Sequence, residues 1–467
     1  MTPEEVSTRL QSTVEAWDNG MGTWPQMSLS SRIASIEKIV DKLLSKRTEM
    51  IDALMLEIGK NHIDAASEID RTITFIRSSI TLLKDSHLST SKSYGSTLTH
   101  TVLLPLGIIL SLGPSNYPLN ETYAMLIPAL LTGNCVIMKI PAVGGLVHLL
   151  TLDIFTSTLP PGVLTFISGG GRATCPLIMS SGLIDGLAFI GSSGAADSLI
   201  KTHPEPHRLK VFSQLEAKNM GVYLKDFNSV KEGVKGSLSY NGQRCTALKI
   251  FFVKKEERVR FDKMFKEEVG KLKVGLPWDG KDGGVTSDIT PLPEGRLEYM
   301  QELISDASSK GALIHGGSII GGPSSRLMNP CVVFGVTKEM RLWEEEQFGP
   351  VVAVAYYDSL EEVVEYGKVG KYAQQISIFT ENEVEDVKML TDKFRNIFGK
   401  ININVAAGRS PDDLAFSGRR SSAMGTMSVR HALEAFTTET VLATKEGMGD
   451  DIFERVKGET KFGEEVV

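Results

Sequence analysis

Hydrophobic and polar positions follow two different rhythms along the chain. In residues 31–56 and 67–84, apolar side chains recur every three or four positions, which predicts helices. Residues 94–104 alternate apolar and polar side chains, as a pair of strands does. Beyond residue 105, short apolar runs alternate with helical segments. This alternation predicts a parallel, doubly wound α/β sheet, a fold that binds nucleotides at the carboxyl ends of its strands.

The same patterns place the individual elements. In the first half we expect strands at 107–112, 135–140, 163–167 and 186–190, with helices at 119–131 and 144–157. A second α/β set follows, with strands at 248–253, 351–357 and 376–379 and helices at 260–272 and 360–366. After a Gly/Ser-rich loop at 408–425 come a helix and an alternating strand at 437–443. This last strand has no obvious hairpin partner and could pair across a subunit interface.

Composition and charge narrow the class of protein. A chain of 467 residues is expected to form two or three domains. The formal net charge of −7 and the absence of a basic run argue against nucleic-acid binding. The N-terminal residues lack a secretory pattern, and no apolar stretch is long enough for a membrane span, so a cytoplasmic protein is expected. Four widely spaced cysteines and unpaired histidines predict no disulfide framework and no metal site.

Cys245 is the first candidate for chemistry. A lone cysteine in an α/β protein is usually an inert core residue. Here polar residues 241–244 precede it, and the charge of Arg244 would favour the thiolate, which is the nucleophilic form. These local residues leave the core and nucleophile readings equally open.

The wider string Tyr-Asn-Gly-Gln-Arg-Cys-Thr-Ala-Leu-Lys at 240–249 resembles the nucleophile motif of the aldehyde dehydrogenase superfamily. Further motifs occur in the order found in that family: Gly-Pro-Ser-Asn-Tyr-Pro at 113–118, Val-Ile-Met-Lys-Ile-Pro at 136–141, Phe-Ile-Gly-Ser-Ser-Gly at 189–194 and Glu-Gln-Phe-Gly-Pro-Val at 346–351. Each motif alone is weak, whereas their common order is strong evidence. The resemblance implies an α/β fold with a Rossmann-like cofactor domain, an α/β catalytic domain and a small oligomerisation element.

The resemblance assigns catalytic roles to two residues. Cys245 would attack an aldehyde to form a thiohemiacetal. Asn116 would donate a side-chain N–H to the oxygen of that adduct, together with the backbone N–H of Cys245. Taken alone, Asn116 would be an ordinary turn residue ahead of Tyr-Pro.

The resemblance also implies an NADP or NAD site. Lys139 and Glu346 would hold the two ribose units, although either alone would more often be a solvated charge. A helix that begins at residues 191–192 can turn its N-terminus to phosphate, and glycines 169–171 allow close approach of the backbone. The complete set of expected coenzyme contacts is Lys139, Ser115, Gly171, Gly191, Ser192, Glu346 and Phe348.

The choice between the two coenzymes depends on one position. Members of the family that require NAD often carry a glutamate three residues after the lysine, where this chain has Ala142. With no carboxylate to repel it, a 2′-phosphate is tolerated, and Lys139 or Arg172 could pair with it. We therefore expect NADP, with NAD as the alternative.

Within the superfamily, the sequence is most similar to the non-phosphorylating, NADP-dependent glyceraldehyde-3-phosphate dehydrogenases. The shared features are Gly-Gln-Arg-Cys-Thr-Ala, Asn-Tyr-Pro-Leu-Asn at 116–120, and Asn-Ile-Asn at 402–404 followed by Arg409. The resemblance gives Arg244, Arg409 and Tyr117 the task of contacting the substrate phosphate, and the planar fork of arginine suits phosphate or carboxylate. We expect a small anionic aldehyde, either glyceraldehyde 3-phosphate or a semialdehyde such as succinic semialdehyde. Taken alone, Arg409 would more often be a solvent-exposed charge on a loop.

One segment departs from the family. The general base is a glutamate in Glu-Leu-Gly-Gly-Lys, but residues 214–218 read Gln-Leu-Glu-Ala-Lys, so Gln214 stands at the base position. The interval from there to Cys245 is also three residues shorter than usual. A glutamine can orient water but cannot accept its proton, and a missing general base costs about 10²–10⁴ in rate.

Three readings of this departure remain, in order of preference. Glu216 could serve as the base, because residues two apart on a strand share a face, although it lies about 6.6 Å further along. Alternatively, a thiol such as coenzyme A takes the acyl group, since residues 217–219 resemble the segment of acylating semialdehyde dehydrogenases, which lack this glutamate. In the third reading turnover is lost, and the protein is a non-catalytic, cofactor-binding relative.

The resemblance also sets the expected domains. A cofactor-binding domain would cover residues 1–217, with an oligomerisation hairpin near 90–104. A catalytic domain would cover 218–425, and residues 426–467 would return to the cofactor domain and end in an oligomerisation strand. In the family's fold, the hairpin and this strand pair between subunits, which implies a homodimer or homotetramer.

Overall fold

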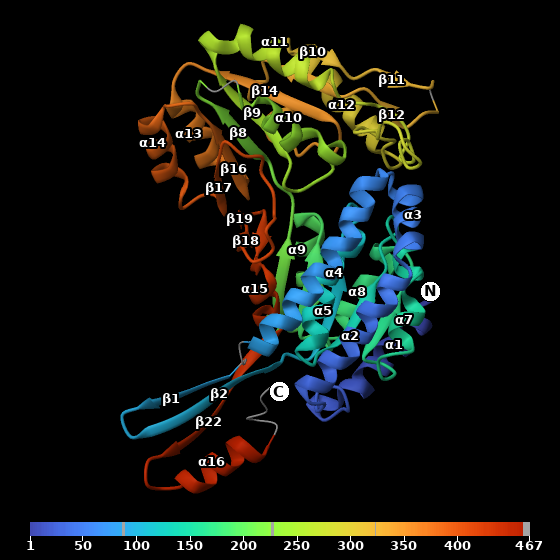
Figure 1. The fold of residues 1–467 in the computed structure, drawn as a ribbon, viewed down its shortest axis with the longest axis vertical. Helices are drawn as coiled ribbons and strands as arrows, with labels where there is room; N and C mark the ends of the chain where they lie inside the picture. The colour runs from blue at the N-terminus through green and yellow to red at the C-terminus, as the bar shows by residue number, and fades with distance from the viewer. Residues whose placement is uncertain (86–88, 226–227, 323, 461–467) are drawn as a thin grey trace. The chain divides into compact units, whose positions relative to one another are not determined.

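The computed structural model describes residues 1–85, 89–225, 228–322 and 324–460. The chain forms two compact units (Figure 1). Unit 1 comprises Met1–Met50, Glu68–Ser213 and Gly425–Val467, and unit 2 comprises Ile51–Ser67 and Gln214–Met424. Each unit is therefore built from separate stretches of the sequence. Among the described residues, we find no helix with the length and apolar character that crossing a membrane requires.

Unit 1 is built around a sheet of buried strands. The strands β7, β6, β3, β4 and β5 are neighbours in that order, and β6, β3, β4 and β5 run parallel. Their side chains are almost all buried on both faces, which explains why the sequence shows continuous apolar runs here rather than alternation. Their bounds are β3 Ile108–Leu112, β4 Cys135–Lys139, β5 Leu164–Ile167, β6 Gly186–Ile190 and β7 Lys210–Gln214.

Helices connect and cover these strands. The apolar helix α5 (Pro118–Leu131) links β3 to β4, and nearly all of its side chains are buried. Thr13 of the N-terminal helix donates a hydrogen bond of 2.8 Å to Thr165 of β5, which fixes that helix against the sheet. The other main helices that contribute to unit 1 are α1 Pro3–Trp17, α2 Leu29–Ser45, α4 His62–Asp85, α8 Gly171–Ser180, α9 Ser193–Thr202 and α15 Val429–Ala435.

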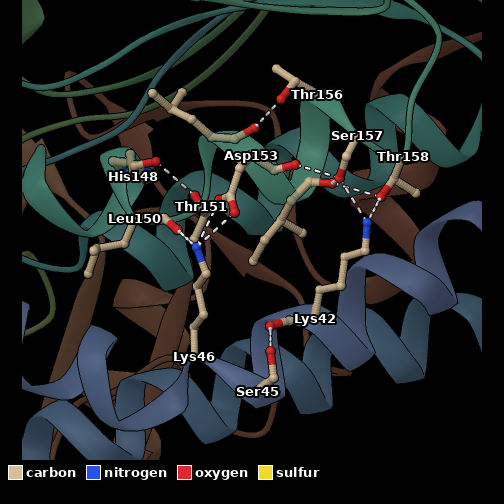
Figure 2. Close-up of polar contacts among 12 residues, drawn as sticks. Lys42, Ser45, Lys46, His148, Leu150, Thr151, Asp153, Thr156, Ser157 and Thr158 are labelled. Atoms are coloured by element: carbon tan, nitrogen blue, oxygen red, sulfur yellow. Dashed lines mark hydrogen bonds and ion pairs between the residues drawn. The ribbon is translucent and has the colours of Figure 1, made fainter.

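Two helices expected as single elements are each divided. The span 31–56 contains α2 and α3 (Arg47–Ile58), which are separated at Lys46, and the span 144–157 contains α6 (Leu146–Leu149) and α7 (Leu152–Thr156). The two breaks support each other, because Lys46 donates to the Leu150 carbonyl at 2.8 Å and pairs with Asp153 at 2.8 Å. Figure 2 shows Lys42 and Lys46 reaching from α2 to this segment. Periodicity could not reveal these breaks, because neither span contains an interior proline.

A separate three-stranded sheet joins distant parts of unit 1. The strands β1 (Ser89–Tyr94) and β2 (Thr97–Pro105) form the expected hairpin, and β22 (Thr437–Lys445) pairs antiparallel with β2 along its whole length. The terminal strand therefore has a partner within its own chain, where the sequence suggested none. Figure 1 shows this long sheet with α16 (Asp450–Glu459) beside it.

Unit 2 contains a seven-stranded sheet in the order β10-β13-β14-β9-β8-β16-β17. One face packs on a cluster that includes Val222, Ile250 and Ile376, and the other on a cluster that includes Phe251, Val253 and Phe379. Successive residues of a strand thus enter opposite cores. The strands are β8 Asn219–Tyr223, β9 Leu248–Lys254, β10 Leu313–Gly316, β13 Cys331–Phe334, β14 Val351–Tyr357, β16 Gln375–Phe379 and β17 Lys400–Ile403. The helices are α10 Val230–Leu238, α11 Arg258–Val269, α12 Arg296–Ser309, α13 Leu360–Val369 and α14 Val384–Phe394.

Candidate active site

Cys245 lies in unit 2 on the loop between α10 and β9, residues 239–247, which we call the Cys245 loop. Three successive residues, Tyr240, Asn241 and Gly242, have positive φ angles of 48°, 56° and 66°. Gly242 could not carry a side chain, because a Cβ atom there would lie 2.7 Å from the Ser237 carbonyl oxygen. The Cys245 side chain is partly exposed, whereas the other three cysteines are buried. The local fold therefore presents this thiol at the end of a sharp, strained turn.

Buried asparagines hold the Cys245 loop. Asn219, the first residue of β8, donates from Nδ2 to the Cys245 carbonyl at 2.8 Å and to the Ala247 carbonyl at 3.2 Å. Asn241 bonds through both ends of its amide to Thr290, at 2.8 Å to the backbone N–H and 3.1 Å to the carbonyl. Two carbonyls of the loop, those of Cys245 and Ala247, are thereby bonded by a buried side chain.

Arg244 points toward the end of the preceding helix. Its guanidinium donates to the carbonyl oxygens of Lys235, Gly236 and Ser239 at 3.3, 2.8 and 3.3 Å. These carbonyls lie in the last turn of α10 and at its C-cap Ser239, where helix carbonyls lack some of their intrahelical partners. The structure thus gives Arg244 a loop-holding role, and its contact with substrate stays a prediction.

A buried charged cluster lies on the segment before β14. Glu346 is about a tenth exposed, and burial raises the pKa of its carboxyl to about 7 against the opposing effect of Lys249, whose Nζ lies 3.8 Å away. Lys249 Nζ also lies 4.7 Å from the centroid of the Phe348 ring. Lys218 donates to the Glu345 carbonyl at 2.7 Å and to Gln347 Oε1 at 2.6 Å. Within the described residues, Oε1 of Glu346 accepts no hydrogen bond, as expected of a group that binds a ligand hydroxyl.

Gln214 and Glu216 have different surroundings. Gln214 ends β7 and is 2% exposed, yet neither atom of its amide has a hydrogen-bond partner among the described residues. Such a group costs about 1–3 kcal/mol unless water or a ligand satisfies it. Glu216 is partly exposed, and it raises the pKa values of both Glu346 and Tyr372, so its carboxylate lies toward them. The two candidates for base chemistry therefore belong to distinct environments.

Asn116 lies in unit 1 on residues 113–117, the Asn116 loop, between β3 and α5. Gly113 packs so closely that a Cβ atom would meet Thr122 Oγ1 at 1.7 Å. One carboxylate oxygen of the buried Glu68 accepts the backbone N–H groups of Leu119 and Asn120 at 3.0 and 3.1 Å, which caps the start of α5. On this loop Ser115 is exposed, while Asn116 and Tyr117 are partly buried.

The carboxyl ends of the neighbouring strands carry the other coenzyme candidates. Lys139 ends β4 and is 6% exposed; burial lowers its pKa, and the nearby Cys175 of α8 opposes this. Gly171 is the first residue of α8, and Ser192 caps α9 by accepting the backbone N–H of Ala195 at 3.3 Å. Gly191 precedes this cap.

These residues fit a dinucleotide. A Cβ atom added at Gly170 or Gly194 would meet no protein atom within 4 Å, so open space lies at the N-termini of both helices. In unit 1, a buried ammonium and two open helix N-termini are suited to phosphate and ribose groups. Lys139, Gly171 and Ser192 of this unit would hold parts of the coenzyme, and the ribose contact of Glu346 in unit 2 stays a prediction.

Arg409 is buried in unit 2, with its Nε 3.3 Å from Asp412 Oδ1. The surface-charge reading of this residue is therefore wrong, because the side chain is only 4% exposed. A carboxylate already faces the guanidinium, and a substrate anion would share it with Asp412.

Sequence reasoning missed the residues that support the site. Asn219, Asn241, Lys249 and Glu68 contact no expected substrate, but they position the loops that carry Cys245 and Asn116. Asn219 and Lys249 were visible only as members of the motifs at 214–219 and 240–249. Glu68 gave no signal, because its partners lie 51 and 52 residues away in the sequence.

A partly exposed thiol on a strained turn and a parallel sheet with open helix N-termini are compatible with an oxidoreductase, and comparison with known proteins agrees. The model of the aldehyde dehydrogenase family matches residues 2–442. The chain therefore belongs to the aldehyde dehydrogenase family, as its motifs predicted, and is an NAD(P)-dependent oxidoreductase.

Individual relatives are similar over most of their length. The chain is 29% identical to the NADP-dependent glyceraldehyde-3-phosphate dehydrogenase of Streptococcus equinus, covering 94% of this chain and 90% of that protein. It is 27% identical to the lactaldehyde dehydrogenase of Methanococcus maripaludis, covering 92% of each. The crystal structure of the NADP-dependent glyceraldehyde-3-phosphate dehydrogenase from Bacillus halodurans C-125, complexed with NADP, is 26% identical with a TM-score of 0.86, covering 96% of this chain and 92% of that one. These findings confirm the predicted fold, the family and a coenzyme that is NADP or NAD.

Proposed function

We propose that the protein oxidises a small anionic aldehyde with NADP through a thioester on Cys245. The observation that carries the proposal is the partly exposed thiol on a turn fixed by Asn219, within electrostatic reach of the Lys249 ammonium. The Cys245 thiolate would form a C–S bond to the aldehyde carbon, and the N–H of Asn116 would stabilise the resulting alkoxide. The bound coenzyme supplies the acceptor for the hydride that leaves this carbon, and a thioester on Cys245 remains.

The coenzyme preference rests on position 142. Ala142 offers no carboxylate to a 2′-phosphate, and the buried Lys139 ammonium lacks an acidic partner among the groups that set its pKa. Titration with NADP and NAD, followed by fluorescence, tests the preference. Tighter binding of NADP that is lost in Lys139→Met supports it, and equal affinities would contradict it.

The similar proteins include a glyceraldehyde-3-phosphate dehydrogenase and a lactaldehyde dehydrogenase, so the identity of the aldehyde has to be tested. Rates of NADPH formation from glyceraldehyde 3-phosphate, succinic semialdehyde and the uncharged lactaldehyde should be compared in wild type and Arg409→Gln. If Arg409 receives the anion, kcat/KM should fall about 10-fold or more for the charged aldehydes and little for lactaldehyde. An equal fall for all three would show that Arg409 only supports the fold with Asp412.

The acyl group on Cys245 would pass to water activated by Glu216. The partial exposure of Glu216 supports this role, because its carboxylate can reach water. Water would attack the thioester carbon, Glu216 would take its proton, and the C–S bond would break to release the acid. In Glu216→Gln, acylation should persist while turnover falls about 10²-fold or more, with the acyl-enzyme visible by intact-mass spectrometry. The matched variant Gln214→Glu should leave turnover of an active wild type little changed.

The alternative acceptor is coenzyme A. The amide of Gln214 is buried and has no partner among the described residues, so it could position a leaving or entering group but not deprotonate water. A thiolate needs no such deprotonation in the site. If the wild-type acyl-enzyme persists in water and discharges rapidly on addition of coenzyme A, the acylating reaction replaces hydrolysis as the proposal.

We also propose that the protein forms a homodimer or homotetramer through the sheet of β1, β2 and β22. The strand order places β22 at one side of this sheet, where exposed strand edges commonly pair with another chain. Light scattering should give two or four times the chain mass of 51.0 kDa. A proline placed at Val441 should lower that mass, because proline removes a backbone donor from the strand.

A further inference from the structure

Lys249 is a fully buried lysine that forms and breaks no bond in the proposed reaction. Its side chain is 2% exposed, and its Nζ donates to the carbonyl oxygens of Gly242 at 2.8 Å and Gln347 at 2.7 Å. Gly242 belongs to the Cys245 loop, and Gln347 follows Glu346 directly. One ammonium therefore bonds the main chains of two segments that are about a hundred residues apart in sequence.

The sheet places these two segments side by side. The Cys245 loop leads into β9. The stretch that carries Glu346 and Gln347, which we call the Glu346 segment, leads into β14, and β9 and β14 are parallel neighbours. Gln347 strengthens the link, because its side-chain amide donates to the carbonyls of Lys249 at 2.5 Å and Val351 at 3.0 Å. The amino-terminal ends of β9 and β14 are thus joined by two hydrogen bonds. The Lys249 side chain donates to the Gln347 carbonyl, and the Gln347 side chain donates to the Lys249 carbonyl.

The ammonium also places a charge between functional groups. Burial lowers the pKa of Lys249 to about 8, while Glu346 and then Cys245 act in the opposite direction, and Arg244 and Arg296 add to the lowering. Electrostatic coupling is reciprocal: if negative charge on Cys245 favours the ammonium, the ammonium favours the Cys245 thiolate to the same extent. Lys218 and Glu216 act on the same cluster through Glu346.

We propose that Lys249 is a positioning residue that joins the Cys245 loop to the Glu346 segment and holds a positive charge on that loop, at the Gly242 carbonyl three residues before Cys245. The thiolate then forms in a prearranged turn. The proposal rests on the proposed role of Cys245 as the nucleophile, and it assigns the activation of that nucleophile to a residue four positions later in the chain.

Lys218 provides a matched control. It is also a buried lysine and also bonds a main-chain carbonyl and Gln347, but the charges that act on it come from Lys249, Glu346 and Glu345, not from Cys245. A purely structural role would make the loss of either lysine equivalent for the thiol. A role in activating Cys245 belongs to Lys249 alone.

The test is the pH dependence of Cys245 alkylation by iodoacetamide, followed by mass spectrometry of the peptide that contains it. Lys249→Gln removes the charge but keeps donors for the two carbonyls. It should move the midpoint of alkylation upward by about one pH unit, since a nearby opposite charge lowers the pKa of an acidic group by about 1–3 units. Lys218→Gln should lower stability and leave the midpoint without an upward shift. An unchanged midpoint in Lys249→Gln, or equal upward shifts in both variants, would overturn the proposal.

A second measurement leaves Lys249 in place and decides the matter if Lys249→Gln does not fold. NMR of the labelled lysine side chains compares the titration of the Lys249 ammonium in wild type and Cys245→Ala. Its midpoint should be lower in Cys245→Ala, and equal midpoints would reject the coupling. Neither assay needs aldehyde or coenzyme, so they can fail while the proposed oxidation holds, and oxidation can fail while they succeed.

Discussion

The Asn116 loop connects a strand to a helix, and the Cys245 loop connects a helix to a strand. The two loops are held in place in different ways. The Asn116 loop depends on one buried carboxylate, Glu68, which caps the helix that follows, and on the close packing of Gly113. The Cys245 loop is fixed by side chains that bond its carbonyls, mainly from Asn219 and Lys249. In the proposed reaction, the first arrangement would orient a neutral donor, whereas the second would fix a group that carries charge.

The largest expected difference between the two loops is in the loss of kcat when their proposed catalytic residues are replaced. Cys245→Ser should lower kcat by about 10⁴-fold or more, because it removes the group that forms the covalent intermediate. Asn116→Ala should cost about 10²–10³-fold, the usual loss for one donor to a developing oxyanion. Steady-state NADPH formation measures both, and Cys331→Ala, which alters a buried thiol in the unit 2 core, serves as the control. Comparable losses in Cys245→Ser and Asn116→Ala would remove the distinction between the loops.

The residues that hold the two loops should also differ in how much they contribute to the free energy of unfolding. Asn219→Ala leaves the Cys245 and Ala247 carbonyls and the Gln375 N–H without their partner, and should lower the free energy of unfolding by about 3 kcal/mol. Glu68→Ala frees two backbone donors and should cost about 2 kcal/mol. Urea denaturation gives both values. The comparison fails if Glu68→Ala proves the more damaging change.

The charged cluster next to the Cys245 loop predicts a pH dependence of stability. The pKa of Glu346 is raised to about 7 by burial, so the folded protein holds a proton that the unfolded chain releases near its ordinary value of 4.5. The contribution of this group to stability is therefore lost as pH rises between these two values. Glu346→Gln should make the urea midpoint less sensitive to pH across that window. An identical slope in wild type and variant would show that Glu346 titrates normally.

The smallest effect is expected away from both loops, where Lys46 joins the break in the helices of unit 1. Its bonds to the Leu150 carbonyl and Asp153 are partly exposed, so Lys46→Met should cost about 1 kcal/mol of unfolding free energy. Asp153→Asn should cost less, since that side chain is 72% exposed. Thermal unfolding curves of the two variants provide the check, and a loss as large as that of Asn219→Ala would contradict this ranking.

The sequence allowed prediction of the parts that depend on local pattern or on motif order. The buried strands and the position of Cys245 before β9 follow from apolar runs and from the string at 240–249. What could not be predicted depends on which main-chain and side-chain groups meet once the chain has folded. Lys46 bonding the Leu150 carbonyl, β22 pairing with β2, and Arg244 turned to the end of α10 are three such cases.

The pairing of β2 with β22 also has a consequence for synthesis. Thr97 pairs with Lys445 and Pro105 with Thr437, so a strand made early by the ribosome must wait for one made more than three hundred residues later. At roughly 5–20 residues per second, this wait lasts for tens of seconds. The larger stretch of unit 2, Gln214–Met424, lies between these two strands in the sequence, so unit 2 can fold first. Meanwhile the edge of β2 that faces β22 remains open to chaperones or to wrong partners on the nascent chain.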